Sequence, residues 1–388
     1  MPRTTLVPRL RPFTSTIFAE MTALAVSTGA VNLGQGFPDT DGPASMLAAA
    51  QAAIGAGINQ YPPGPGRPEL RAAIAAQRSR YGTHFDPDTE ILVTVGATEA
   101  IAASLLALVD TGDEVIMFEP YYDSYAASVA MSGATRRVVS LAEEPSGRFG
   151  LDADALRAAV TPATKAILVN TPHNPTGTVL TAEELAEIAA VCIEHDLLAI
   201  TDEVYEDLLF DGLTHVPLGS LPGMADRTLT ISSAGKSFNC TGWKIGWVCG
   251  PAQLVAAVRS AKQFLTFVGG APFQPAIAHA LNHEGAWVKD MRDSLAVKRD
   301  RLSAGLAQAG FGVRPTAGTY FVCADVRPLG FTDGLELCRE LPGRIGVAGV
   351  PVQVFTDNPD RWRHLVRFAF CKKDEILDEA IERLHKLG

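Results

Sequence analysis

The chain has 388 residues, of which 47% are hydrophobic and 20% are charged, and its formal net charge is −10. This length and composition are typical of a soluble protein with two domains, or with one large domain and a smaller one appended. The acidic balance excludes nucleic acid as an expected partner, and the lack of any run of about 18 apolar residues excludes a membrane span.

The middle of the chain alternates short apolar runs with amphipathic stretches. Strands are predicted at residues 91–95, 114–118, 165–169, 197–201 and 228–231, and helices at 97–109 and 181–195. Thr181 and Glu184 form a capping box that marks the start of the second helix. Apolar strands separated by helices predict an α/β fold with a mostly parallel sheet covered on both faces.

The last hundred or so residues have a different pattern. They predict a long charged helix at 287–309, strands at 319–323 and 364–370, and a final helix at 374–387. We expect a separate antiparallel sheet here. The domains that follow are an N-terminal segment 1–39 joining the small domain, a large domain 40–280, and a small C-terminal domain 281–388.

The six cysteines form no Cys-x-x-Cys pair and no cluster with zinc spacing, so no metal is expected. They are interpreted as reduced and mostly buried thiols, which fits a cytoplasmic protein. No apolar core of a signal peptide follows the first residues.

Chemically capable side chains follow the predicted strands, where ligands gather in open α/β sheets. They occur in the segments 96–98, 170–177, 202–205 and 232–236. Lys236 follows small residues and could approach a cofactor; to form a Schiff base its amine must be neutral part of the time. The alternative is a surface lysine in a glycine-containing turn. A Walker phosphate loop is rejected, because the upstream glycine of that motif is missing.

Asp202 ends a buried strand, where its charge needs a partner. A pyridinium N–H is one candidate, and a cap on a following helix is the other. Tyr205, three residues later, could face the same ligand, and the Asn174 amide lies in a turn sequence that could present it to a cofactor oxygen. Thr98, Ser233 and Lys244 are candidate phosphate contacts.

Together these motifs resemble the class I/II aminotransferases of fold type I. The matching pattern is Asn174-Pro-x-Gly177, Asp202-x-x-Tyr205, Ser233-x-x-Lys236 and Lys244, with further similar segments at 31–39, 59–61, 93–96, 119–122 and 365–368. Within the family the chain is most similar to the branch of kynurenine aminotransferases and actinobacterial N-succinyldiaminopimelate aminotransferases. The resemblance implies a large domain with a mostly parallel sheet, plus a smaller α+β domain built from the C-terminus and the N-terminal segment.

The resemblance also implies a cofactor, pyridoxal 5′-phosphate (PLP). Lys236 then holds it as a Schiff base and moves the proton during catalysis, while Asp202 pairs with the ring nitrogen. Asn174 and Tyr205 contact its phenolic oxygen and Tyr122 stacks on the ring. The implied phosphate contacts are Ala97, Thr98, Ser233 and Lys244, together with Tyr61 from the neighbouring subunit of a homodimer. Lysine at 244 and alanine at 97 depart from the arginine and glycine common in relatives.

Arg367 matches the residue that binds the substrate α-carboxylate, a task suited to a planar guanidinium. Gly34 and Asn174 are implied beside it, and Phe18 in the side-chain pocket, with Phe267 added from across the dimer. Tyr122 and Tyr125 would also suit an aromatic substrate.

The expected function is ping-pong transfer of an amino group from an L-amino acid to a 2-oxo acid, 2-oxoglutarate by resemblance, within amino acid metabolism or biosynthesis. N-succinyl-LL-2,6-diaminopimelate and kynurenine or another aromatic amino acid are the candidate donors. The main alternative is a PLP-dependent cysteine-S-conjugate β-lyase that uses the same residues. A non-catalytic sensor with a DNA-binding domain is disfavoured, because the residues before Phe18 leave no room for that domain.

Overall fold

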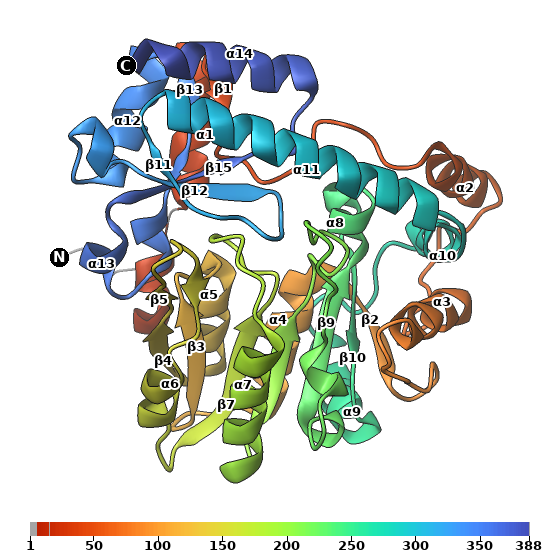
Figure 1. Ribbon diagram of the computed structural model, residues 1–388. Coiled ribbons are helices and arrows are strands. Elements are labelled where there is room, and N and C mark those ends of the chain that lie inside the picture. The colour runs from red at the N-terminus through yellow and green to blue at the C-terminus, as the bar shows by residue number, and fades with distance from the viewer. Residues whose placement is uncertain (1–5, 15, 388) are drawn as a thin grey trace.

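The computed structural model describes residues 6–14 and 16–387, so that positions 1–5 and 15 of the predicted segment 1–39 lie outside the described residues, as does position 388. Its centre is a seven-stranded sheet (Figure 1). In spatial order the strands are β2 (Ile91–Val95), β10 (Ile245–Cys249), β9 (Thr228–Ser233), β8 (Leu198–Asp202), β7 (Thr164–Asn170), β3 (Glu114–Glu119) and β4 (Thr135–Ser140). All neighbours are parallel except β10, which is antiparallel to β2 and β9. The predicted mostly parallel sheet is confirmed.

Helices cover both faces of this sheet (Figure 1). One layer contains α4 (Gly96–Leu108), α5 (Asp123–Ser132) and α9 (Ala252–Lys262), and the other contains α6 (Ala153–Ala159) and α7 (Ala182–Glu194). Successive side chains of a strand point to opposite faces of the sheet, so alternate residues of β3 pack against the two helix layers. Val115 packs with the first layer and Ile116 with the second. The capping box of Thr181 and Glu184 at the start of α7 is confirmed.

The C-terminal part forms its own antiparallel sheet, as predicted. Its strands in order are β11 (Gly312–Val313), β12 (Phe321–Asp325), β15 (Leu365–Ala369) and β14 (Val350–Pro351). The surrounding helices are α11 (Gly285–Gln308), α12 (Gly334–Arg344), α13 (Pro359–Trp362) and α14 (Asp374–Leu384). In Figure 1, α11 runs across the top of the molecule from α10 (Phe273–His283) to α14.

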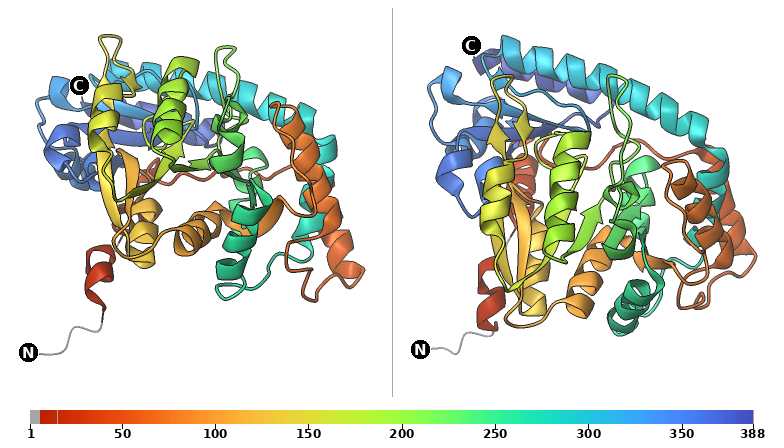
Figure 2. Two further views of the ribbon diagram at one scale, coloured as in Figure 1. Left: turned by 90° about the horizontal axis from the view of Figure 1, so that it is seen from below. Right: turned by 60° about the horizontal axis from the view of Figure 1, so that its bottom comes forward.

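The N-terminal segment joins this C-terminal sheet region. Its α1 (Ile17–Thr28) packs on α12, and β1 (Val31–Asn32) pairs in parallel with β13 (Val347–Ala348). At the opposite end, α2 (Ala44–Gly55) and α3 (Pro68–Ser79) lie against α10, as the orange and teal helices of Figure 2 show. The short pair β5 (Ala142–Glu143) and β6 (Phe149–Gly150) completes the strands. The domain limits at 39/40 and 280/281 stay predictions.

The structure differs from the sequence-based expectation in several details. The sequence does not predict β4 or β10; β4 is an edge strand with half-buried arginines, and β10 contains Gly246. The strand expected at 319–323 begins only at Phe321, because Thr319 adopts a φ of +69° that no regular strand allows.

All six cysteines are unpaired and buried, as the sequence predicts for most of them. Among the described residues, none of the helices combines the length and the apolar character that crossing a membrane requires.

Candidate functional site

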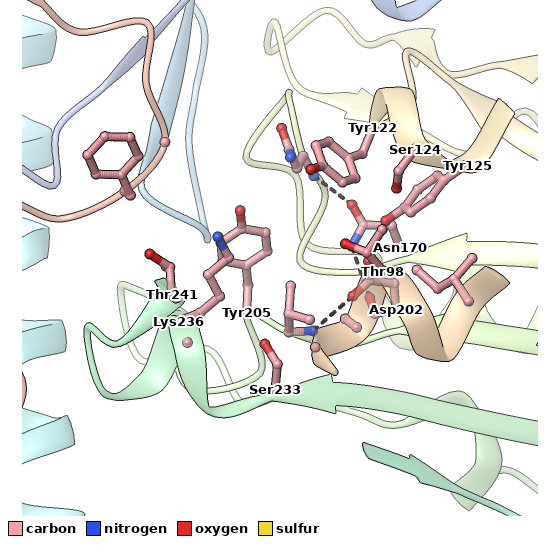
Figure 3. A pocket seen from close by; sticks show the side chains of 18 of the residues that line it. Thr98, Tyr122, Ser124, Tyr125, Asn170, Asp202, Tyr205, Ser233, Lys236 and Thr241 are labelled. Atoms are coloured by element: carbon pink, nitrogen blue, oxygen red, sulfur yellow. Dashed lines mark hydrogen bonds between the residues drawn. The ribbon is translucent and has the colours of Figure 1, made fainter. Parts of the chain in front are cut away.

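A cavity of about 280 Å³ lies at the carboxyl ends of the parallel strands, where the sequence places its ligand. Figure 3 shows side chains from several loops gathered around it. The predicted site residues that line it are Phe18, Ala97, Thr98, Tyr122, Asn174, Asp202, Tyr205, Ser233, Lys236, Lys244 and Arg367. Gly34, Tyr61 and Phe267 do not line it.

Lys236 lies in α8 (Ala234–Ser237), directly after β9, and not in an exposed turn. Its Nζ donates to the hydroxyl of Tyr320 at 2.8 Å. Burial lowers the pKa of Lys236 to about 8, and the neighbouring cations Arg367 and Lys244 act in the same direction. A lysine with this pKa is neutral often enough near pH 8 to act as a nucleophile and a base.

Asp202 ends β8 and is only 5% exposed. Its carboxylate accepts hydrogen bonds from the Tyr125 hydroxyl at 2.6 Å and from the Val204 N–H at 3.2 Å, and burial raises its pKa. It forms no ion pair within the described chain. Residues 204–207 form a turn and no helix begins there, so the alternative of a cap on a following helix is wrong.

Two supporting residues were not predicted in these roles. Tyr125 was expected to line an aromatic substrate pocket, but its hydroxyl is directed at Asp202. Asn170 ends β7 and was not singled out; its amide donates to the carbonyls of Asp202 at 2.9 Å and Pro172 at 3.1 Å, and its Oδ1 accepts from the Asn174 N–H at 2.8 Å. Asn170 thereby fixes the loop that carries Asn174 relative to β8.

The start of α4 provides an anion site. The first N–H groups of a helix have no acceptor within it, so they can bind an anion together with a nearby cation. Lys244 supplies that cation: a Cβ placed on Gly96, whose φ is +73°, would lie 2.9 Å from the Lys244 Nζ. Gly246 lets β10 approach equally closely, since a Cβ there would lie 2.5 Å from the Gly96 carbonyl carbon. Thr98 and Ser233 add hydroxyls to the same wall.

Arg367 of β15 is 1% exposed and crosses from the C-terminal sheet to the cavity. It donates to the Oδ1 of Asn174 at 2.8 Å and to the carbonyl of Gly34 at 3.0 Å, while its Nε has no partner. No carboxylate of the described chain pairs with it. A buried guanidinium without a counter-ion is costly, so the site is suited to a ligand carboxylate.

Gly34 lies behind Arg367. Its N–H donates to the Oδ1 of Asn32 at 2.9 Å, which holds the Gly34 backbone in place. The Gly34 carbonyl accepts from the guanidinium of Arg367 and so positions the arginine. The predicted contact between the Gly34 backbone and the substrate stays a prediction.

Tyr61 and Phe267 lie on the surface, 81% and 50% exposed, with their rings 5.4 Å apart. Phe264 and Leu265 are exposed beside Phe267 in the sequence. Adjacent exposed apolar side chains are typical of a protein interface.

The comparisons with known proteins agree with this geometry. The sequence model of the family "Aminotransferase class I and II" matches residues 28–384. The chain belongs to this family. It is therefore an aminotransferase, an enzyme that acts on amino acids and oxo acids, and the predicted family and fold type are confirmed.

Individual relatives of this aminotransferase cover nearly its whole length. A Mycobacterium tuberculosis protein named as a probable N-succinyldiaminopimelate aminotransferase, DapC, is 61% identical, with 98% of each chain covered. The solved structure of N-succinyldiaminopimelate aminotransferase from that organism has a TM-score of 0.97 and covers 99% of this chain and 100% of that one. Methionine aminotransferase of Escherichia coli is 38% identical, with 98% and 99% covered.

Behind the cavity of this aminotransferase lies a buried ion-pair network. Glu203 and Glu206, in the turn between Asp202 and Asp207, both accept from the fully buried guanidinium of Arg78 in α3, and Glu203 also contacts His215 at 2.8 Å. These two carboxylates and the histidine have metal-ligand chemistry, but the guanidinium of Arg78 already fills the position between the carboxylates. The network therefore ties α3 to the turn that carries Tyr205.

Replacing Arg78 with alanine is expected to lower the free energy of unfolding by about 3–5 kcal/mol, because it removes the guanidinium that two buried carboxylates share. Urea denaturation followed by circular dichroism measures the change. The matched control is Arg301→Ala, which removes an arginine paired with Asp374 at 2.9 Å on the surface and should cost under about 1 kcal/mol. Equal losses in the two variants would contradict a supporting role for the network.

Proposed function

We propose that this aminotransferase uses PLP, bound covalently through Lys236, to transfer an amino group from an L-amino acid to 2-oxoglutarate. The single observation behind the proposal is that one cavity brings three groups together. They are Lys236, with a pKa near 8, the buried carboxylate of Asp202, which has no ion-pair partner, and Lys244, beside a helix N-terminus. PLP carries a partner for each of them. Its aldehyde matches Lys236, its protonated ring nitrogen matches Asp202, and its phosphate matches Lys244.

The donor set of the cavity fits the cofactor residue by residue. Asp202 would accept from the ring nitrogen, Tyr122 would lie against the ring, and Asn174 and Tyr205 would contact its phenolic oxygen. The phosphate would be held by Ala97, Thr98, Ser233 and Lys244. When bound, PLP supplies an electron sink that makes the α-proton of the amino acid acidic enough to remove.

The protein's own groups perform the remaining tasks. Arg367 would bind the α-carboxylate of the donor and orient its Cα–H bond toward Lys236. The neutral Nζ of Lys236 would take the proton from Cα, and the resulting ammonium would return it to the acceptor carbon. The same arginine would bind the α-carboxylate of the 2-oxo acid in the second half of the reaction.

The substrate class follows from similarity and from the lining of the cavity. We propose N-succinyl-LL-2,6-diaminopimelate as the amino donor, supported by the relative of that name at 61% identity. Kynurenine or another aromatic amino acid is the second candidate, supported by the rings of Phe18 and Tyr122 in the cavity wall and by kynurenine–oxoglutarate transaminase 3 of mouse, 38% identical. No observation favours the β-lyase alternative.

We also propose a homodimer with shared sites. The exposed pair of Tyr61 and Phe267 is suited to reach a neighbouring subunit, Tyr61 toward its phosphate site and Phe267 toward its substrate pocket. A particle mass of twice the chain mass in solution supports this arrangement, and a monomer at catalytic concentrations contradicts it. A cytoplasmic location stays a prediction, supported by the six unpaired cysteines.

The decisive experiment locates the cofactor. Purified protein is incubated with PLP, reduced with borohydride and digested, and mass spectrometry is expected to find the pyridoxyl group on Lys236. Modification of another lysine would overturn the proposal.

A second experiment identifies the substrate with a panel of donors and 2-oxoglutarate. The panel contains N-succinyl-LL-2,6-diaminopimelate, kynurenine and methionine, and glutamate formation is the readout. Pyruvate and ammonia released from a cysteine conjugate, without glutamate, would favour the lyase.

A further inference from the structure

The hydroxyl of Tyr320 lies between the amine of Lys236 and the backbone of the N-terminal segment. It accepts a hydrogen bond from Nζ of Lys236 at 2.8 Å and donates one to the carbonyl of Gly36 at 2.6 Å. A carbonyl oxygen can only accept, so the phenolic proton is directed at Gly36 and the phenolic oxygen is left to accept from the lysine. The direction of both hydrogen bonds is therefore fixed by Gly36.

This fixed direction matters for the lysine. A neutral amine has two N–H donors and one lone pair, and only the lone pair can attack a carbon or take a proton. Because Tyr320 accepts, it binds an N–H of Lys236 and leaves the lone pair free. Among the described residues, the hydroxyl of Tyr320 is the hydrogen-bond partner of Lys236 Nζ.

The backbone holds Tyr320 in place from both sides. Thr319, a β-branched residue, has a φ of +69°, which such residues adopt only when their surroundings force it. Its N–H donates to the Leu208 carbonyl at 2.9 Å, which connects this turn to the segment that follows Tyr205. On the other side, the Tyr320 carbonyl accepts from the Phe370 N–H at 2.9 Å. The Tyr320 ring, 1% exposed, packs edge-on against Tyr205 at 5.3 Å.

We propose that Tyr320 is a positioning residue that holds the free amine of Lys236 with its lone pair available to the reacting carbon. The proposal rests on the assignment of Lys236 as the PLP lysine. It gives the amine a defined resting place whenever it is not bonded to the cofactor. Tyr320 also connects Lys236 to Gly36, which lines the cavity. Gly36 lies two residues after Gly34, whose carbonyl accepts from Arg367.

Tyr320→Phe tests the proposal, because it keeps the buried ring and removes only the hydroxyl. The first readout is the rate at which the apoenzyme captures PLP covalently as a function of pH, measured by borohydride trapping at Lys236. The rate of the wild-type protein is expected to rise through pH 8, where its amine becomes neutral. An acceptor stabilises the ammonium form more than the neutral form, so losing it should move the midpoint to lower pH, and the plateau rate should fall about 10-fold as the amine loses its orientation.

The variant keeps the other side chains around the amine, and of these only Tyr205 loses an interaction with the hydroxyl of Tyr320. The charged and titratable ones are Asp202, Tyr205, Lys244, Arg367 and Cys371. A shift in the midpoint between the two proteins therefore reports the hydroxyl of Tyr320.

The second readout is catalytic. With a donor deuterated at Cα, the holoenzyme variant should show a larger isotope effect on kcat than the wild type, with KM changed less than about 2-fold, because proton removal by Lys236 becomes slower while substrate binding does not change. The matched control is Tyr121→Phe, which removes a partly buried hydroxyl that donates to Asp357 at 2.6 Å outside the cavity. It should leave the midpoint and the isotope effect unchanged.

The possible outcomes distinguish the positioning role of Tyr320 from the proposed PLP function of Lys236. If Tyr320→Phe matches the wild type in the capture midpoint and in the isotope effect, the positioning role is overturned while Lys236 keeps its assignment. If the wild-type protein does not capture PLP at Lys236, the proposed function itself fails and the role of Tyr320 fails with it.

Discussion

Replacing Lys236 with alanine is expected to lower kcat by on the order of 10⁴-fold or more, since one side chain supplies both the covalent anchor and the proton carrier. The methyl group of alanine can neither bond to the cofactor nor accept the Cα proton. Initial rates of glutamate formation with a saturating donor measure the change. The absorbance of the protein with PLP should also become that of the free aldehyde, because the amine proposed to form the Schiff base is missing and Lys244 is expected to bind the phosphate.

Lys298→Ala is the matched control for that variant. Lys298 donates from Nζ to the Lys372 carbonyl at 2.6 Å and does not line the cavity, so its loss should leave both kcat and the absorbance unchanged. A Lys236→Ala protein that still formed a reducible covalent complex with PLP in the cavity would show that another amine is the anchor.

Much of this site could be predicted because its residues follow strand ends. Asp202 is the last residue of β8, and Lys236 lies in the short helix that follows β9. Parallel strands bring such residues to one edge of the sheet. The same logic located Asn174 after β7 and Thr98 after β2. The family resemblance added Arg367, which belongs to the other sheet and which strand order alone would not bring to the cavity.

The residues that were missed act through contacts that no local pattern encodes. Tyr125 lies in α5, one turn beyond the predicted Tyr122, and only the packing of α5 on the sheet directs its hydroxyl at Asp202. Tyr320 falls in a segment that reads as a continuous strand of apolar residues. Thr319 has a left-handed backbone conformation, so the strand begins only at Phe321. A β-branched residue rarely adopts this conformation and gives no sequence signal for it.

Replacing Arg367 with lysine is expected to lower kcat/KM for the amino donor and for 2-oxoglutarate alike, by about 10²–10³-fold, or about 3–4 kcal/mol. A lysine offers a single charged group in place of two parallel N–H donors, so the carboxylate is bound less tightly and in a less defined orientation. Both half-reactions should be affected, because both substrates carry an α-carboxylate. The affinity for PLP should change much less, since Asp202 and the phosphate-binding residues are intact and only the hydrogen bond from Arg367 to Asn174 is altered.

A donor without a carboxylate distinguishes binding from general damage in that variant. The amine analogue of the donor lacks the group that Arg367 would bind, so its slow reaction should proceed at the same rate in the variant and the wild type. Arg299→Lys is the matched control, because Arg299 is a buried arginine bonded to Asp211 and the Thr316 carbonyl outside the cavity. If the amino acid and its amine analogue lose rate equally in Arg367→Lys, the arginine supports the fold of the site and does not bind the carboxylate.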